Sequence, residues 1–304
     1  MKTVVIFGGS GFIGRNIIRR LSKQGYRVIV PYQKPAKEAE LRLYGNVGQI
    51  IPIKFKKLNE DKIKSIINNS DIVLNLKTIW QEKKGYFFKE HILNFNIHLV
   101  DLINTTEKNK IFIFFSGLGV SKESPSKRVR YITKAENYIL NNLNKAIIIR
   151  PSVVIGDGDQ FLGKLLPIFK FSFIIPLFGT GEAKLQPVFV DNIAYAVEII
   201  LKQDVKDNNI YELVGPEIFS YKTFYQFIVN CLSLKRKFIP IPFGFASIVV
   251  SIIEKTPISL ITKDQLLLFN EDNISSNRHK NFSNLGISPN DIRETIKKIV
   301  SKNS

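Results

Sequence analysis

The sequence has a single cysteine and no apolar run long enough to cross a membrane. Cys231, in "FIVNCLSLK", has no partner for a disulfide, which excludes a disulfide framework and favours a reducing compartment. We expect this thiol to fill apolar space rather than act as a nucleophile. No secretion signal precedes the first apolar segment. We therefore expect a cytoplasmic protein; the alternative is peripheral attachment to an inner membrane, on the mitochondrial matrix side in a eukaryote.

Acidic residues are also scarce. The chain has 26 Asp and Glu residues against 44 Lys and Arg, a net charge of +18. Such a charge is compatible with nucleic acid, with an anionic membrane or acidic partner, or with a compositional bias that serves no partner. The basic residues are scattered, and no nucleic-acid module with interleaved aromatics is recognisable, which argues against nucleic acid.

The three histidines are not clustered with other metal ligands. His91 and His98 lie in an apolar segment and His279 in a polar one, so no metal site is expected. Two apolar stretches, residues 165–179 and 240–261, are interrupted by Lys, Pro or Glu before reaching the length of about 20 residues that a membrane span needs. They are interpreted either as the core of a small lobe or as an exposed face that docks on a membrane or a hydrophobic subunit.

Short apolar runs alternate with segments of helical period along the first half of the chain. The runs carry branched and aromatic residues, as strands buried on both faces do. They lie at 3–7, 27–31, 50–55, 71–76, 110–116 and 146–152, and the helical segments at 12–24, 59–69, 89–108 and 129–143. This order predicts an α/β fold with a doubly wound parallel sheet.

A glycine-rich turn joins the first predicted strand to the first helix. Gly8, Gly11 and Gly14 have the spacing G-x-x-G-x-x-G. Glycine permits positive φ and a close approach of the backbone to a pyrophosphate, while the helix N-terminus offers free N–H groups. A dinucleotide site is favoured over a merely structural turn. The predicted contacts from this turn are Gly8, Ser10, Gly11, Phe12, Ile13, Gly14 and Arg15.

The tip of the second strand bears on the identity of the dinucleotide. An NAD site usually has an acid there for the ribose 2′-hydroxyl, whereas this tip reads Tyr32, Gln33, Lys34 and has no acid before Glu38. Arg15 can reach the same corner. NADP(H) is therefore favoured over NAD(H), although Lys34 can also be an ordinary solvated lysine.

Several motifs together resemble the atypical short-chain dehydrogenase/reductases of the NAD-dependent epimerase/dehydratase superfamily. They include "GGSGFIGR", "RPSVVIGDGDQFL", "QPVFVDNIAYAV" and "YELVGP". Within the superfamily, the chain is most similar to the alpha-subcomplex subunit 9 family of respiratory complex I and its bacterial relatives, from Thr3 to about Asn273. The resemblance implies a Rossmann domain over 1–156, to which 187–215 return, and a small lobe mainly from 157–304. It also implies an NADPH that mitochondrial members hold without turning over.

Further cofactor contacts are expected at the ends of later strands. Leu76 and Lys77 follow the fourth strand, where family members commonly have glycine after "NL"; Lys77 can compensate by contacting phosphate. Ser116 ends the fifth strand, where similar enzymes carry a catalytic Ser or Thr, although a simple strand-terminating role is equally compatible. Pro151 and Val154 continue from the sixth strand beneath the nicotinamide.

The helical segment 129–143 decides whether the protein is an enzyme. Active short-chain enzymes carry Tyr-x-x-x-Lys, whose i,i+4 spacing puts both side chains on one helix face. Here Tyr131 and Lys134 are three residues apart, and Arg130 stands four before Lys134. We interpret Lys134 as a ribose ligand, with a solvent-facing lysine as the alternative, and regard a catalytic Tyr131 as the weaker hypothesis.

Two functions follow from these observations. The first is an NADP(H)-binding accessory or assembly component of complex I without catalysis. The second is an active NAD(P)H-dependent reductase or epimerase in quinone metabolism. The displaced tyrosine favours the first, and the sequence identifies no substrate.

Overall fold

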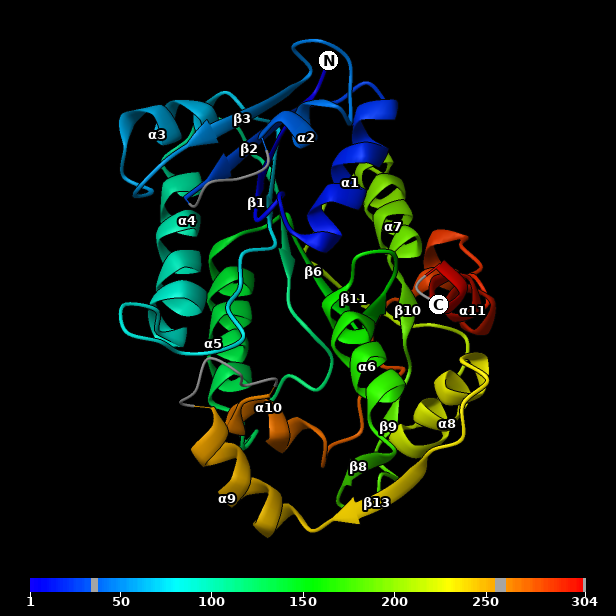
Figure 1. The fold of residues 1–304 in the computed structure, drawn as a ribbon. Helices are drawn as coiled ribbons and strands as arrows, with labels where there is room; N and C mark the ends of the chain where they lie inside the picture. The colour runs from blue at the N-terminus through cyan, green and yellow to red at the C-terminus, as the bar shows by residue number, and fades with distance from the viewer. Residues whose placement is uncertain (34–37, 255–260, 303–304) are drawn as a thin grey trace.

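A computed structural model describes residues 1–33, 38–254 and 261–302 of the chain. Its main sheet has seven parallel strands in the order β11-β6-β5-β4-β1-β2-β3 (Figure 1). These strands are β1 (Thr3–Phe7), β2 (Arg27–Tyr32), β3 (Ile50–Lys54), β4 (Ile72–Asn75), β5 (Ile111–Phe115), β6 (Ala146–Pro151) and β11 (Asn209–Leu213). The chain order reverses between β1 and β4, as in dinucleotide-binding sheets. The predicted doubly wound α/β fold is therefore confirmed.

Helices cover both faces of the sheet because alternate strand residues point to opposite sides. Val4 and Ile6 of β1 join one apolar cluster, and Val5 and Phe7 join another. On the first face lie α1 (Phe12–Lys23) and α7 (Val190–Lys202); on the second lie α3 (Asp61–Asn68), α4 (Phe95–Asn104) and α5 (Lys127–Asn142). A short helix α2 (Glu38–Arg42) follows β2, and a π-helical turn (Lys89–Asn94) leads into α4.

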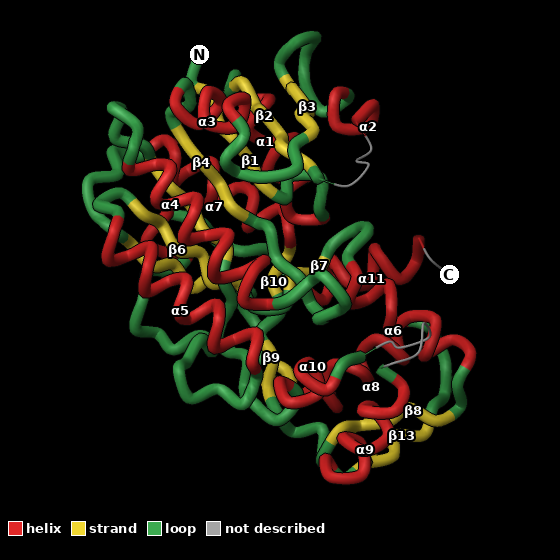
Figure 2. The backbone as a smooth tube through the Cα atoms, turned by 90° about the vertical axis from the view of Figure 1, so that its left-hand side faces the viewer, coloured by secondary structure: helices red, strands yellow, loops and turns green. Residues whose placement is uncertain are grey.

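The remaining elements form a smaller lobe below the carboxyl edge of the sheet (Figures 1 and 2). Its helices are α6 (Gln160–Phe171), α8 (Tyr221–Cys231), α9 (Phe243–Ile253), α10 (Lys263–Leu268) and α11 (Ile292–Lys302). Its paired strands are β8 (Ile174–Phe178) with β13 (Lys237–Ile241), and β9 (Lys184–Leu185) with β12 (Phe219–Ser220). The pair β7 (Val154–Ile155) and β10 (Val188–Phe189) lies between the lobe and the sheet. A separate apolar cluster, which includes Phe169, Phe224 and Ile296, fills the lobe.

The C-terminal part of the chain returns to the main sheet. Lys280 pairs with the open side of β11, donating its N–H to Ile210 O and accepting from Glu212 N at 3.1 and 2.8 Å. The following 3₁₀ helix (Phe282–Leu285) buries its apolar side chains in the sheet's core cluster. The expected lobe of 157–304 thus contains a segment that packs on the sheet, in addition to the expected return of 187–215.

Candidate functional site

A cavity of about 1370 Å³ runs between the carboxyl edge of the sheet and the small lobe. One end is lined by the turn after β1 and by the tip of β2, and the other by α6, α8 and α10. Ligands of open α/β sheets bind at this edge, where the strand order reverses. The sequence-predicted residues that line it are Gly8, Ser10, Gly11, Phe12, Ile13, Gly14, Tyr32, Gln33, Leu76, Lys77, Ser116, Pro151 and Val154.

The glycine turn has the geometry that its residue types require. Gly8 has φ +77°, and a Cβ there would lie 2.9 Å from the backbone of Leu76. A Cβ at Gly14 would lie 2.6 Å from Gly9 Cα, so glycine lets α1 pack closely on the turn. Gly11 is the N-cap of α1, whose first turn contains no acid. The helix therefore directs free N–H groups and its positive end at the cavity.

Two lysines and a glutamine form the cavity wall near the tip of β2. Lys77 donates from Nζ to Gln33 Oε1 at 2.7 Å, and Gln33 donates from Nε2 to Lys56 O at 2.8 Å. Burial lowers the pKa of Lys77 to about 8. Lys56 also lines the cavity, although the sequence analysis did not select it. It follows β3, the neighbour of β2, so strand order was the signal that could have identified it.

Two further cations, Arg15 and Lys34, are expected at this corner from the sequence. Arg15 does not line the cavity; its Nη1 lies 3.1 Å from Glu40 Oε1, and Tyr44 donates to the same oxygen at 2.7 Å. An acid on α2 thus holds this guanidinium, and the expected role of Arg15 at the dinucleotide stays a prediction. Lys34 lies outside the described residues.

The wall of the cavity contains a hydroxyl without a hydrogen-bond partner in the described residues. Ser116 Oγ, at the end of β5, is buried and makes no hydrogen bond within the described part of the chain. Buried hydroxyls normally have a partner, so a ligand with a polar group fits this position. Together with the glycine turn and the Lys77 corner, the residues present fit a dinucleotide laid along the sheet edge.

The pair predicted on α5 does not reach the cavity. Lys134 is exposed, with Nζ 5.6 Å from the centre of the Tyr131 ring, and neither residue lines the site. The contact of Lys134 with the ribose and the weaker hypothesis of a catalytic Tyr131 stay predictions, which this placement of the two side chains does not favour. The i,i+4 pair on the cavity face of α5 is instead Arg128 and Ile132.

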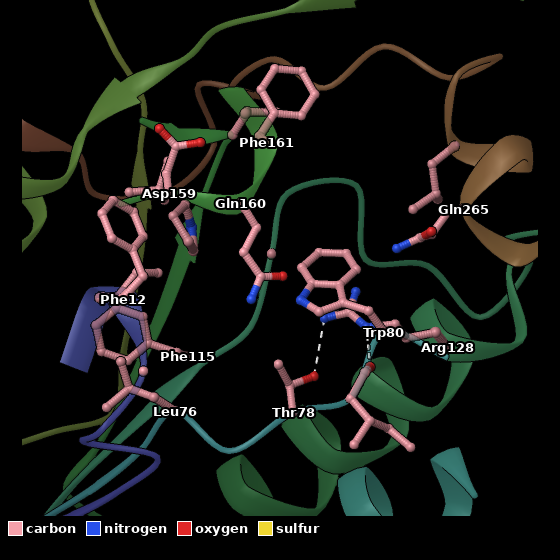
Figure 3. Close-up of a pocket in the computed structure, with 18 of the residues that line it drawn as sticks. Phe12, Leu76, Thr78, Trp80, Phe115, Arg128, Asp159, Gln160, Phe161 and Gln265 are labelled. Atoms are coloured by element: carbon pink, nitrogen blue, oxygen red, sulfur yellow. Dashed lines mark hydrogen bonds between the residues drawn. The ribbon is translucent and has the colours of Figure 1, made fainter. Parts of the chain in front are cut away.

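Arg128 is held tightly in the cavity wall. It donates from Nε to Ile79 O at 3.0 Å and from Nη2 to Thr78 Oγ1 at 3.1 Å, and its Cζ lies 3.8 Å from the Trp80 ring centre (Figure 3). Only 7% of Arg128 is exposed, and burial lowers its pKa to about 10. A positive charge therefore stands on the cavity face of α5, where neither Tyr131 nor Lys134 lies.

The opposite end of the cavity is largely apolar. Tyr221 and Tyr225 of α8 line it, and burial raises the pKa of both hydroxyls, which disfavours their ionisation. Asp159 caps α6, accepting from Leu162 N at 2.7 Å. Among the residues that the structure covers, no group of three or more His, Cys, Asp or Glu side chains could hold a metal ion.

This sheet, turn and cavity have the arrangement of a dinucleotide-binding protein, and residues 4–139 match the NAD dependent epimerase/dehydratase family. The chain is 29% identical over 303 residues to NADH dehydrogenase [ubiquinone] 1 alpha subcomplex subunit 9, mitochondrial, of Arabidopsis thaliana, covering 95% of this chain and 74% of that protein. It is 24% identical to the mitochondrial NADH-ubiquinone oxidoreductase 40 kDa subunit of Neurospora crassa, covering 95% and 76%.

The fold is similar to that of human epimerase family protein SDR39U1 (isoform 2) with NADPH. The TM-score is 0.69 at 18% identity, over 98% of this chain and 99% of that one. The family resemblance stated from the motifs is thus confirmed.

Proposed function

We propose that this protein binds NADP(H) without turning it over and serves as an accessory or assembly component of respiratory complex I. Support for a dinucleotide comes from the glycine turn, the free N-terminus of α1 and the unsatisfied Ser116 hydroxyl. Support for the association comes from relatives named as subunits of that complex.

The observation that carries the non-catalytic part of the proposal is the pair Arg128 and Ile132 on the cavity face of α5. Proton transfer to a substrate carbonyl needs a donor near the reacting atoms with a pKa matched to the task. Arg128 keeps its protons at neutral pH, and Ile132 has none to give. Tyr131 is held on another side of α5, where it packs against the core.

NADP(H) is supported by the charges near the β2 tip. Lys56 and Lys77 line the cavity beside Gln33, and no carboxylate is part of the described wall there. A 2′-phosphate pairs with such cations, whereas the ribose 2′-hydroxyl of NAD(H) usually meets an acid. When bound, the dinucleotide would supply a hydride donor or acceptor; the protein's contribution is to hold and orient it.

Turnover by the purified protein tests the proposal. NADPH should stay bound through dialysis and should not be oxidised when quinones, sugar nucleotides or short aldehydes are added. Tyr131→Phe should change neither binding nor oxidation. Measurable NADPH oxidation that Tyr131→Phe abolishes, with binding unchanged, would refute the accessory role and favour the alternative reductase or epimerase. The size of the cavity, which exceeds what the glycine turn and β2 tip surround, is the observation that favours this alternative.

The small lobe supports peripheral attachment at an inner-membrane surface beside that complex. Helix α9 exposes Phe245, Ile248 and Ile252 by 62%, 64% and 67%. Much of the lobe around α9 lacks acidic residues: no Asp or Glu occurs in residues 160–181 or 218–253. An apolar helix face in an acid-free, lysine-bearing region suits an anionic lipid surface. No helix in the described ranges is long and apolar enough to cross a bilayer.

Fractionation tests this attachment. The protein should co-migrate with complex I in native gels of solubilised inner membranes and should be partly released by salt. The double variant Ile248→Ser/Ile252→Ser should shift it to the soluble fraction, because it removes the apolar contact. Val47→Ser is the matched control, since Val47 is fully exposed on the sheet domain, far along the chain from α9. Unchanged membrane recovery of the double variant would contradict the role of α9.

A further inference from the structure

The cavity extends beyond the edge of the sheet into the small lobe. We name this extension the lobe arm; it is lined by Phe161, Leu165, Ile168, Phe178, Leu268 and Phe269. These residues come from α6, β8 and the region of α10, none of which belongs to the main sheet. A dinucleotide held by the glycine turn lies along the sheet edge, so it leaves the lobe arm for a second ligand.

The wall of the same cavity contains a buried cation, Arg128, whose side chain forms no salt bridge within the described residues. Its Nη1 makes no hydrogen bond within them either. The nearby Asp264 carboxylate lies 3.4 Å from the Arg128 backbone N and accepts hydrogen bonds from Ser126 and Lys127 at the start of α5. Its two side-chain acceptors, Ile79 O and Thr78 Oγ1, are uncharged. Burying a charge is costly unless an opposite charge pairs with it. The Nη1 group is therefore available to donate a hydrogen bond to an anionic ligand in the cavity.

The acids that line the cavity do not fill this role. Asp159 accepts backbone N–H groups at the start of α6, and Asp272 accepts from Lys184 N at 2.8 Å. Burial raises the pKa of Glu271, which favours its neutral form. In Figure 3, Arg128 lies against Trp80, while Phe161 and Gln265 project from the lobe side of the cavity.

We propose that the lobe arm binds an anionic amphiphile, with its acidic head at Arg128 and its apolar chain among the phenylalanines and leucines of the arm. An apolar wall of this kind stabilises an alkyl chain in proportion to the area that it buries. A nucleoside diphosphate sugar is disfavoured, because its polar rings would face Phe and Leu side chains. This second site is independent of which dinucleotide the glycine turn holds and of any partner.

Calorimetric titration of the NADPH-saturated protein with monomeric dodecanoate tests the proposal. Dodecanoate should bind, and affinity should rise from octanoate to dodecanoate by about fourfold per methylene at most, the factor for burying one CH₂ group. Dodecanol should bind at least about tenfold more weakly, since a charge-assisted hydrogen bond to Arg128 is lost. UDP-glucose should not compete with dodecanoate.

Two variants distinguish the binding of the ligand's acidic head from the binding of its alkyl chain. Arg128→Met should weaken dodecanoate at least about tenfold and leave dodecanol unchanged, because the charged contact to the ligand's head is lost while the apolar residues of the lobe arm are kept. Arg130→Met is its matched control: Arg130 lies on the same helix but bonds the carbonyls of Ser124 and Pro125, outside the cavity. Leu268→Trp should weaken both ligands by filling the arm.

Three outcomes would overturn the proposal. One is equal affinity for dodecanoate and dodecanol in the unmodified protein. Another is displacement of dodecanoate by UDP-glucose together with no dependence on chain length. The third is a loss of NADPH affinity in Arg128→Met as large as the loss of dodecanoate affinity, which would assign Arg128 to the dinucleotide site. Thermal unfolding of each variant identifies a loss of binding that comes from misfolding.

Discussion

Two long walls of the cavity differ in the functional residues that they carry. The wall formed by the β1 turn and α1 has glycines at the tight positions and an uncapped helix N-terminus free of acids. The wall formed by α5 has Arg128 and Ile132 where a proton-transferring pair would be needed. The first wall has the features that dinucleotide binding needs, whereas the cavity face of the second carries neither Tyr131 nor Lys134.

The difference follows from how each wall works. Phosphate binding uses backbone N–H groups and the helix dipole, so it depends on chain geometry and on the lack of side chains. Proton transfer depends on one hydroxyl at one position, and a displacement of about 1 Å can cost about 10²-fold in rate. Dinucleotide binding and catalysis therefore depend on different features of this fold. A protein can lose the catalytic residues and still keep the dinucleotide-binding site.

The largest effect on NADPH affinity is expected from a negative charge added at the N-terminus of α1. Gly11→Asp should weaken NADPH binding by about 100-fold or more, because a carboxylate at the positive end of α1 repels the pyrophosphate. The fold should persist, since Gly11 has φ −74° and aspartate is a favourable N-cap. Calorimetric titration measures the affinity, and thermal unfolding checks the fold.

Ser220→Asp provides the control for an added N-cap acid. Ser220 caps α8 in the small lobe and does not line the cavity, so NADPH affinity should stay as in the unmodified protein. If Gly11→Asp bound NADPH normally, the glycine turn would not be the phosphate site, and the contrast between the two walls would disappear.

A change of pH is expected to have an intermediate effect on NADPH affinity. The pKa of Lys77 is about 8 in the free protein, so below pH 8 the ammonium is already charged and pairs with phosphate at no protonation cost. Above pH 8 binding must first take up a proton, so NADPH affinity should fall about tenfold between pH 7 and 9. Fluorescence titration at both pH values measures the change.

The same titration with NADH sharpens the assignment of Lys77. NADH lacks the 2′-phosphate, so its affinity should change by less than about threefold over this range. Lys77→Met should remove the pH dependence for NADPH. Equal losses of affinity for the two dinucleotides would indicate that Lys77 contacts the pyrophosphate rather than the 2′-phosphate.

The smallest effect is expected on the outer side of α5. Lys134→Ala should change NADPH affinity by less than about twofold, because the side chain is exposed and outside the cavity. Competition binding with a fluorescent dinucleotide resolves such a difference. A tenfold loss would indicate that Lys134 reaches the ribose in the bound state and would support the sequence-based interpretation.

The sheet and the glycine turn could be predicted from sequence because their signals are local. The strand runs and the G-x-x-G-x-x-G spacing each lie within a few residues, and every predicted strand of the first half is present to within two residues. Glu40 could not be assigned to Arg15 in this way, since 25 residues separate the two. Their pairing depends on where α2 packs.

The orientation of α5 could not be predicted from the sequence either. Its N-cap, Ser126, donates to Asp264 Oδ2 at 2.7 Å, and Lys127 N donates to Oδ1 of the same carboxylate at 2.7 Å. Asp264 belongs to α10, 138 residues from Ser126. A contact across the two parts of the fold thus contributes to which face of α5 meets the cavity, and no pattern within 129–143 contains that information.

The pairing of Lys280 with β11 has a consequence for biosynthesis. Strand β11 is the last of the seven along the chain and lies at the edge of the sheet, where unpaired N–H and C=O groups invite another chain to add a strand. Its cover is supplied about 70 residues later, so a ribosome adding about 5 to 20 residues per second leaves this edge open for several seconds. During that interval the nascent protein is most vulnerable to association with other unfinished chains, and a product terminated before Lys280 would retain this vulnerability permanently.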